Sequence, residues 1–204
     1  MPILMRFLLC LAVLTAQVPV AFAQDAPDPS ITRIDIHLRD SRLLLDADVD
    51  FPLTAVVRDA AERGLPLYVT ADLTVGHPRW WWFDRVDLQA STTWRIVFNA
   101  LTRQWRVGQG ELSFPVSSLD DALLVVRNIR NWDLGDSDEF KPGTRYEGQM
   151  RVRLDNSLLP RPLQVNALNS SAWSIATPWS AFSFQVEPPA QPGSGSQTTQ
   201  QVGQ

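Results

Sequence analysis

The alternation of apolar and polar residues is the clearest pattern along the chain. Over residues 33–39, isoleucine and leucine alternate with charged residues and a histidine, and over residues 43–51 apolar residues alternate with aspartates. A period of two is typical of strands that bury one face. Residues 40–41 lie between these segments, and we predict that they form the two-residue turn of an antiparallel hairpin.

The register of this hairpin follows from the requirement that both apolar faces point to the same side. The register that satisfies it also sets one favourable and one unfavourable pair of charged residues opposite each other. The predicted pairs are Leu38–Leu43, Ile36–Leu45, Arg33–Asp48 and Asp35–Asp46.

Two other segments carry apolar residues at helical spacing. The first follows Pro52, which suits the first position of a helix, and ends before Gly64. The second is capped by Ser118, and its apolar stripe extends to Ile129. A polar loop is predicted over residues 133–143.

Further strands are predicted wherever the alternation returns. These segments are residues 67–75, 86–98, 104–107, 111–116, 146–154 and 182–186. About seven strands joined by hairpins, together with two amphipathic helices, predict an α+β fold that is mainly antiparallel β-sheet. A sandwich with helical insertions is the alternative arrangement of the same elements.

The first 23 residues have the features of a secretory signal peptide. Arg6 precedes an apolar run at residues 7–14, and Ala21-Phe22-Ala23 supplies the small residues for cleavage before Gln24. The run is shorter than the roughly 20 residues of a spanning helix, so we expect no transmembrane span after cleavage. We expect a periplasmic or otherwise exported protein. An inner-membrane anchor formed by an uncleaved signal is the alternative.

The rest of the chain divides into three predicted parts. Residues 24–30 are a flexible lead-in, residues 31–187 a single folded domain, and residues 188–204 a disordered tail rich in proline, glycine, serine and glutamine. The only cysteine, Cys10, leaves with the signal peptide. The mature chain therefore has no disulfide and no thiol nucleophile. A net charge of −4 argues against a nucleic-acid partner.

Two motifs carry a resemblance to a known family. They are Arg-Trp-Trp-Trp-Phe-Asp at residues 79–84 and Pro-Arg-Pro-Leu-Gln-Val-Asn at residues 160–166. Together with shorter motifs in the same order over residues 31–187, they resemble a proteobacterial family of exported proteins catalogued as domain of unknown function 4390. The resemblance implies an exported location and an accessory role beside an envelope sensor kinase. It brings no catalytic residue and no cofactor.

The tryptophan run is the strongest candidate binding segment. In an extended chain, successive side chains point to opposite faces, so one pair of aromatic rings in this run can be exposed. Exposed indoles beside an arginine suit a peptide, a glycan or a protein surface. The alternative is that both pairs are covered. The candidate partner-binding residues are Arg79, Trp80, Trp81, Trp82, Phe83 and Trp105.

A row of aspartates is the only candidate metal site. Asp46, Asp48 and Asp50 point to one face of a predicted strand, and three carboxylates are a possible ligand set for calcium. With Arg33 and His37 on the neighbouring strand, a solvated charged face is the more ordinary interpretation.

The sequence contains no motif that identifies a complete set of catalytic residues. The histidines are His37 and His77, and neither a Gly-x-Ser-x-Gly motif nor a phosphate-binding glycine loop occurs. We therefore expect a non-catalytic envelope protein that binds a protein or peptide partner and uses no cofactor. Two alternatives stay open: a purely structural envelope component, and a glycan-directed hydrolase that uses carboxylates such as Asp46, Asp48 or Asp84.

Overall fold

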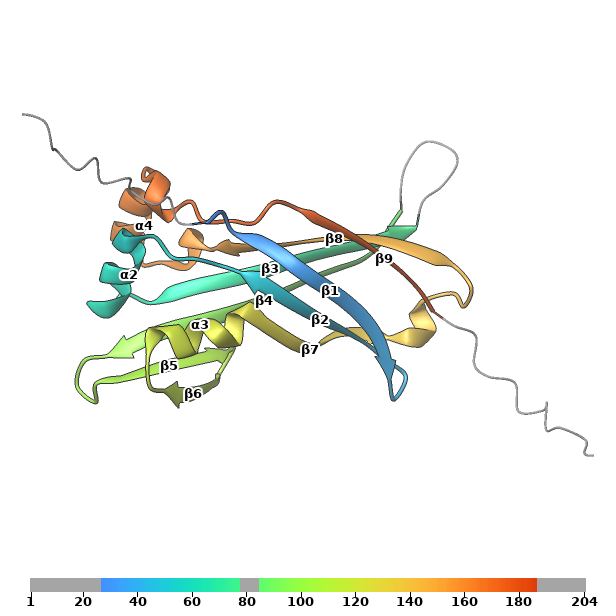
Figure 1. Ribbon diagram of the computed structural model, residues 1–204, viewed down its shortest axis with the longest axis horizontal. Helices are drawn as coiled ribbons and strands as arrows, with labels where there is room; N and C mark the ends of the chain where they lie inside the picture. The colour runs from blue at the N-terminus through green and yellow to red at the C-terminus, as the bar shows by residue number, and fades with distance from the viewer. Residues whose placement is uncertain (1–26, 78–84, 187–204) are drawn as a thin grey trace, which may run out of the picture.

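The computed structural model describes residues 27–77 and 85–186 (Figure 1). Nine strands lie in this part of the chain: β1 (Ser30–Arg39), β2 (Arg42–Asp50), β3 (Leu67–His77), β4 (Arg85–Asn99), β5 (Gln104–Gln109), β6 (Leu112–Val116), β7 (Asn128–Asp136), β8 (Arg145–Leu154) and β9 (Ser180–Gln185). The α-helices are α2 (Ala55–Glu62), α3 (Leu119–Arg127) and α4 (Arg161–Leu168). Short 3-10 helices are η1 (Ser137–Glu139), η2 (Asn156–Leu158) and η3 (Ser171–Trp173).

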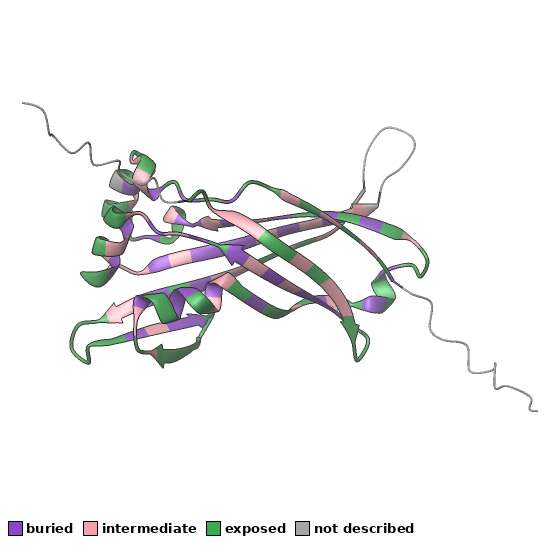
Figure 2. Ribbon diagram, viewed as in Figure 1, coloured by how far each residue is buried: buried purple, intermediate pink, exposed green. Residues whose placement is uncertain are grey.

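The strands form two antiparallel sheets that share one core. The smaller sheet has the order β1-β2-β7, and the larger has the order β6-β5-β4-β3-β8-β9. Apolar side chains from both sheets and from the helices meet in a single buried cluster. Along β8, buried and exposed residues alternate, as the bands in Figure 2 show. The predicted α+β fold of mainly antiparallel sheet is confirmed, with nine described strands instead of about seven.

The predicted β1–β2 hairpin is confirmed residue by residue. The observed pairs include Leu38–Leu43, Ile36–Leu45, Arg33–Asp48 and Asp35–Asp46. Asp40 and Ser41 have φ angles of 50° and 61°. Two successive left-handed residues are the signature of a tight turn whose twist matches that of the strands.

The helix ends differ in part from those predicted. Helix α2 begins three residues later than expected, at Ala55 instead of Pro52, because Thr54 forms the cap, its hydroxyl accepting a hydrogen bond from the Val57 backbone amide at 3.3 Å. The predicted stop is confirmed, since Gly64 follows the helix with a φ of +94°. The predicted cap of α3 is also confirmed, with the Asp121 amide donating to the Ser118 hydroxyl at 3.0 Å.

The main difference from the prediction is strand β7. Ile129, which the apolar stripe placed in a helix, lies in this strand, and the strand extends into the predicted polar loop. β7 pairs with β2 through two register shifts, each with one extra residue on β7. These bulges break the alternation of apolar residues that would otherwise identify the strand.

The two sheets are unequal in width, and this positions the site. At one side of the sandwich β1 lies near β9. At the other side the small sheet ends at β7, whereas the large sheet continues from β4 to β5 and β6. Helix α3 covers part of this extension (Figure 1) and buries Leu119, Ala122, Leu123 and Val126. The remainder is left uncovered by the small sheet.

The β5–β6 hairpin depends on Gly108. A Cβ atom at this position would lie 1.9 Å from the Leu112 carbonyl oxygen and 2.5 Å from the Ser113 Cα atom. Because both atoms belong to the backbone, β6 would have to move away. We predict that Gly108→Ala lowers the free energy of unfolding by about 1–3 kcal/mol, measured by urea denaturation. Glu111→Ala, at the exposed turn, is the matched control and should change it by no more than about 0.5 kcal/mol; equal effects of the two substitutions would contradict the prediction.

Candidate functional site

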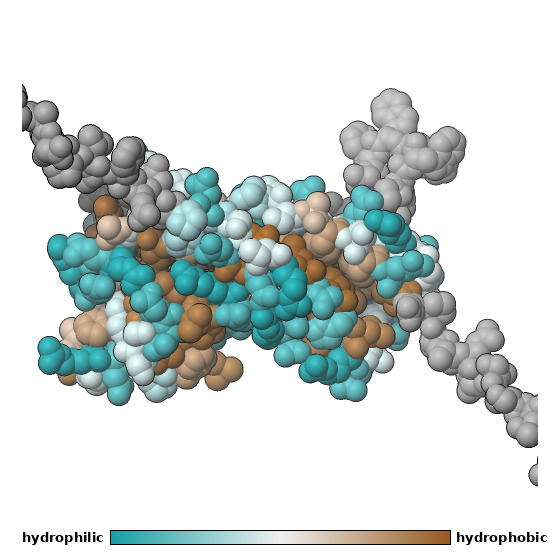
Figure 3. Space-filling model, viewed as in Figure 1, coloured by the Kyte–Doolittle hydropathy of each residue, from teal (hydrophilic) through white to brown (hydrophobic). Residues whose placement is uncertain are grey.

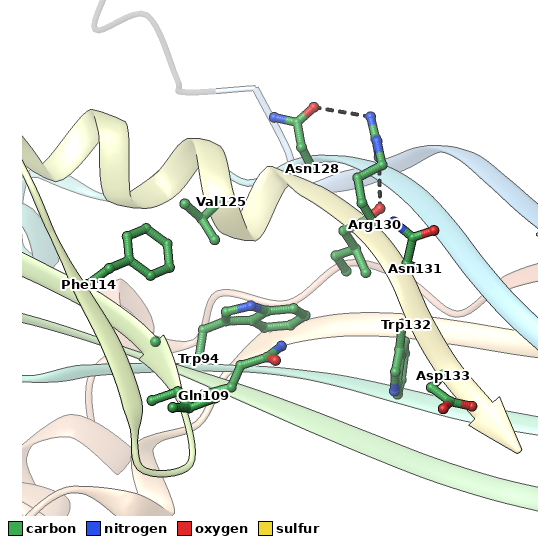
Figure 4. Close-up of a pocket in the computed structure, with 12 residues that line it drawn as sticks. Trp94, Gln109, Phe114, Val125, Asn128, Arg130, Asn131, Trp132 and Asp133 are labelled. Carbon is green, nitrogen blue, oxygen red and sulfur yellow. Dashed lines mark hydrogen bonds between the residues drawn. The ribbon is translucent and has the colours of Figure 1, made fainter.

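A groove of about 690 Å³ opens where the small sheet ends (Figure 4). It lies between strand β7 and the β4–β5–β6 part of the large sheet. Its lining residues are Trp94, Gly108, Gln109, Leu112, Phe114, Val125, Asn128, Ile129, Arg130, Asn131, Trp132 and Asp133. A volume of this size lies within the range of ordinary ligand pockets.

The floor of the groove is mostly apolar and ends at an exposed rim on β6. Trp94 pairs with Gln109, and Gln109 pairs with Leu112, so the three residues form one row across the large sheet. Trp94 is 5% exposed, whereas Leu112 is 82% exposed and Phe114 48%. Brown, apolar surface is accordingly visible near α3 and β6 in Figure 3. Two large apolar side chains are thus exposed to water beside the hollow.

The wall of the groove comes from α3 and β7. Val125 lies in the last turns of α3, and β7 starts at the residue after the helix ends. Figure 4 shows the indoles of Trp94 and Trp132, one from each sheet, bordering the same space. The groove therefore has aromatic residues on both its floor and its wall.

The aspartate row attaches β7 to the rest of the small sheet. At one bulge Asn131 has a φ of 50°, and its backbone amide donates a hydrogen bond of 2.7 Å to Asp46 Oδ1. The side chain of Asp46 thus supplies the acceptor for a backbone amide at the position where the strand register shifts. Arg130 donates to Asp48 Oδ1 and, at 2.9 Å, to the Ala47 carbonyl.

A second set of ion pairs holds the far end of β7. Arg42 of β2 donates to Asp133 at 2.7 Å and to Asp136 at 2.8 Å. The hydrogen bond from Arg42 holds the pKa of Asp133 below its usual value, and the Gly135 amide adds to the effect. The pKa of Asp48 is lowered because Arg33 and Arg130 both donate to its carboxylate. Both carboxylates are thus stabilised in their charged form.

The structure gives the aspartate row no metal-binding geometry. Within residues 27–77 and 85–186, no group of three or more histidine, cysteine, aspartate or glutamate residues could hold a metal ion. Asp46 and Asp48 are engaged by Asn131, Arg33 and Arg130, as described above. Asp50 is exposed at the end of β2.

Of the predicted partner-binding residues, only Trp105 falls within the described part of the chain. Arg79, Trp80, Trp81, Trp82 and Phe83 lie outside it. Trp105 is 7% exposed, and its ring lies 5.1 Å from that of Phe98, so it contributes to the core and offers little surface to a partner. The groove itself was not predicted.

The carboxylates needed for glycan hydrolysis are not paired in the groove. Asp133 is the one carboxylate among the described lining residues, and it is bound to Arg42. Retaining and inverting hydrolases both use two facing carboxyl groups. Asp46 and Asp48 bind β7, and Asp84 lies outside the described residues.

A separate polar cluster on the outer face of the large sheet is internally neutralised. Asp72 accepts hydrogen bonds from Arg151 at 3.1 Å and Arg153 at 2.9 Å, and Arg153 also pairs with Asp155 at 2.9 Å. Burial acts to raise the pKa of Asp72, but the two arginines more than offset it, and the net shift is downward. These two arginines therefore offer little free charge to an anionic partner.

We predict that Asp46 can be replaced by asparagine but not by alanine. Asp46→Ala leaves the backbone amide of Asn131 without its acceptor and should lower the free energy of unfolding by about 1 kcal/mol. Asp46→Asn keeps an acceptor oxygen and removes the repulsion from Asp35 opposite, so its stability should equal or exceed that of the parent. Hydrogen exchange of the Asn131 amide should be faster in the alanine variant alone; equal exchange in both variants would contradict this role.

We also predict a loss of stability in acid. Because the folded pKa of Asp48 and Asp133 is lower than in the unfolded chain, their contribution is complete well above an unfolded value of about 3.9. It is lost as the pH falls below about 4, through the lower folded values. Urea midpoints measured between pH 7 and pH 3 should show a smaller acid-induced drop for Asp48→Asn than for the parent. An identical drop would exclude Asp48 as a contributor.

Comparison with known proteins places the chain in a family without giving it an activity. No curated protein and no solved structure matches the chain. In the part of the chain that the structure describes, no helix is both long and apolar enough to cross a membrane. The sequence model of the family described as Domain of unknown function (DUF4390) matches residues 26–183. The protein therefore belongs to the DUF4390 family.

Proposed function

We propose that this protein is an exported, non-catalytic domain that binds an apolar segment of a partner protein in the groove beside β7. The observation that carries the proposal is the uncovered part of the large sheet's inner face, with Leu112 82% exposed and Phe114 48% exposed beside an open hollow. Covering such residues with apolar atoms removes them from water and is favourable by roughly 25 cal/mol per Å².

The chemistry of the groove supports binding over catalysis. Its charged lining residues, Arg130 and Asp133, are both bound to side chains of the small sheet. An activated nucleophile or a general base would need a free titratable group with access to the bound molecule. By contrast, tryptophans such as Trp94 and Trp132 are the residues that most often anchor a partner.

The polar side chains that β7 contributes to the groove suit a peptide chain. Among the described residues, no group pairs with the side-chain amide of Asn131, which lies at the bulge of β7. An amide can donate and accept at once, as a peptide group requires. The charged lining residues of β7, Arg130 and Asp133, are already ion-paired, so the segment that fits here is uncharged.

An exported location is part of the proposal and rests on the signal-peptide features of residues 1–23. A partner in the same compartment is another exported protein or the exported part of a membrane protein. The envelope sensor kinase implied by the family resemblance belongs to the second group.

We predict that the exposed rim can be made polar with loss of binding but without loss of the fold. The mature protein should select uncharged, apolar sequences from a displayed library of random twelve-residue peptides. The double variant Leu112→Gln, Phe114→Gln should bind the selected peptides at least about tenfold more weakly, measured by fluorescence anisotropy, because it removes two apolar contacts of about 1 kcal/mol or more each.

The matched control is Leu101→Gln. Leu101 is 96% exposed in the β4–β5 turn, outside the groove lining, so this variant should bind as the parent does. Circular dichroism should show that all three proteins are folded. Selection of no peptide, or equal binding by the double variant, would favour a purely structural envelope component.

A further inference from the structure

Strand β4 is much longer than the strand that covers its outer edge. β5 pairs with β4 only from Trp94 to Asn99 and then turns back at Gly110, which has a φ of +54°. The first part of β4, residues 85–93, pairs with β3 on one side. On the other side, no strand among the described residues pairs with it. Within residues 27–77 and 85–186, its outward-pointing backbone groups therefore form an unpaired sheet edge that leads to Trp94 in the groove.

Residues 88–93 of this edge lack the features that protect the edge strands β1, β6 and β7. Natural sheets discourage strand addition with prolines, bulges and charged residues. Strand β6 contains Pro115, β7 has two bulges, and β1 has charged residues along its length. Residues 88–93 of β4, Leu-Gln-Ala-Ser-Thr-Thr, include no charge and no proline, and they pair with β3 without a register shift.

We propose that an extended, uncharged segment of a partner protein adds to residues 88–93 of β4 as a further strand, in line with β5, and inserts alternate apolar side chains toward the groove. The proposal rests on the function proposed above and specifies its mode of recognition. Main-chain hydrogen bonds to β4 would supply affinity, and the pocket beside Trp94 would select the side chains.

The side chains around the edge set the pattern of the segment. On the inner face Leu88 and Ala90 are half-buried, as is Trp132 on the opposite sheet. On the outer face Gln89 and Ser91 are exposed. Because side chains alternate along a strand, the added segment should carry apolar residues toward Trp132 and polar residues toward solvent.

Two other occupants fit the groove less well. A second copy pairing through its own residues 88–93 would bring Leu88, Ala90 and Thr92 to the inner face, and with only one large side chain among them they fill little of a groove of about 690 Å³. The chain's own segment 188–204 contains one apolar residue besides alanine, Val202. A partner segment with larger apolar side chains is therefore the occupant to which the geometry points.

Backbone methylation of a peptide tests strand addition directly. The probe is the end-capped octapeptide Thr-Phe-Gln-Leu-Thr-Phe-Gln-Leu, with two derivatives in which alternate amides are N-methylated in opposite frames. In a strand, successive amides point to opposite edges. Methylation in the frame that faces β4 should weaken binding at least about tenfold through loss of two or more hydrogen bonds, while the other frame binds as the parent peptide does.

The outcomes separate this inference from the function on which it rests. Strand addition is overturned if methylation in either frame weakens binding equally. Groove binding is still supported in that case if the unmethylated peptide binds the double variant Leu112→Gln, Phe114→Gln more weakly than the parent protein. If that double variant binds the unmethylated peptide normally, the proposed function fails as well.

Hydrogen exchange gives an independent measurement on the protein itself. Alternate amides within residues 88–93, those facing away from β3, should exchange rapidly in the free protein and become protected when the octapeptide binds. Protection of all six amides in the free protein would overturn the proposal. So would a doubling of mass in sedimentation equilibrium that the peptide reverses, since a second copy would then occupy the edge.

Discussion

The groove depends on the contacts by which two carboxylates of β2 hold the irregular strand β7. Strand β7 has an extra residue at two places, so its backbone cannot pair continuously with that of β2. Asp46 accepts from the Asn131 amide, and Asp48 accepts from Arg130. These contacts keep β7 attached at a position where regular strand pairing is interrupted, and β7 is the wall without which the floor at Trp94 would be an open sheet face.

The part of the fold that sequence predicts well is the part in which the period of two is unbroken. In the β1–β2 hairpin, a one-residue slip would turn Leu43 and Leu45 to solvent, so a single register satisfies the pattern. In β7 the buried residues Ile129 and Leu134 are separated by five positions, because one bulge inserts a residue between them and the other bulge lies at Leu134 itself. Apolar residues at such spacing fit neither a strand nor a helix, so the sequence predicts a helix end and a loop for this segment.

The site was beyond sequence analysis for a different reason. Trp94 lies on a strand that was predicted, and its inward direction follows from the alternation of β4. The groove beside Trp94 exists because the two sheets differ in width. This difference depends on the strand order of the sheets and not on any local sequence pattern. Trp105 illustrates the reverse case, because it is a candidate partner-binding residue in the sequence and its indole packs on Phe98 in the structure.

The direct junction of α3 and β7 has a mechanical consequence. Arg127 is the last residue of the helix and Asn128 the first of the strand, so no linker absorbs a displacement of the wall. The helix is fixed by four buried side chains, including Leu123 and Val126. The packing of α3 in the hydrophobic core thus fixes the position of β7 and the width of the groove. In a groove whose walls are already ordered, binding of a segment costs less conformational entropy, so more of the free energy of the contacts contributes to affinity.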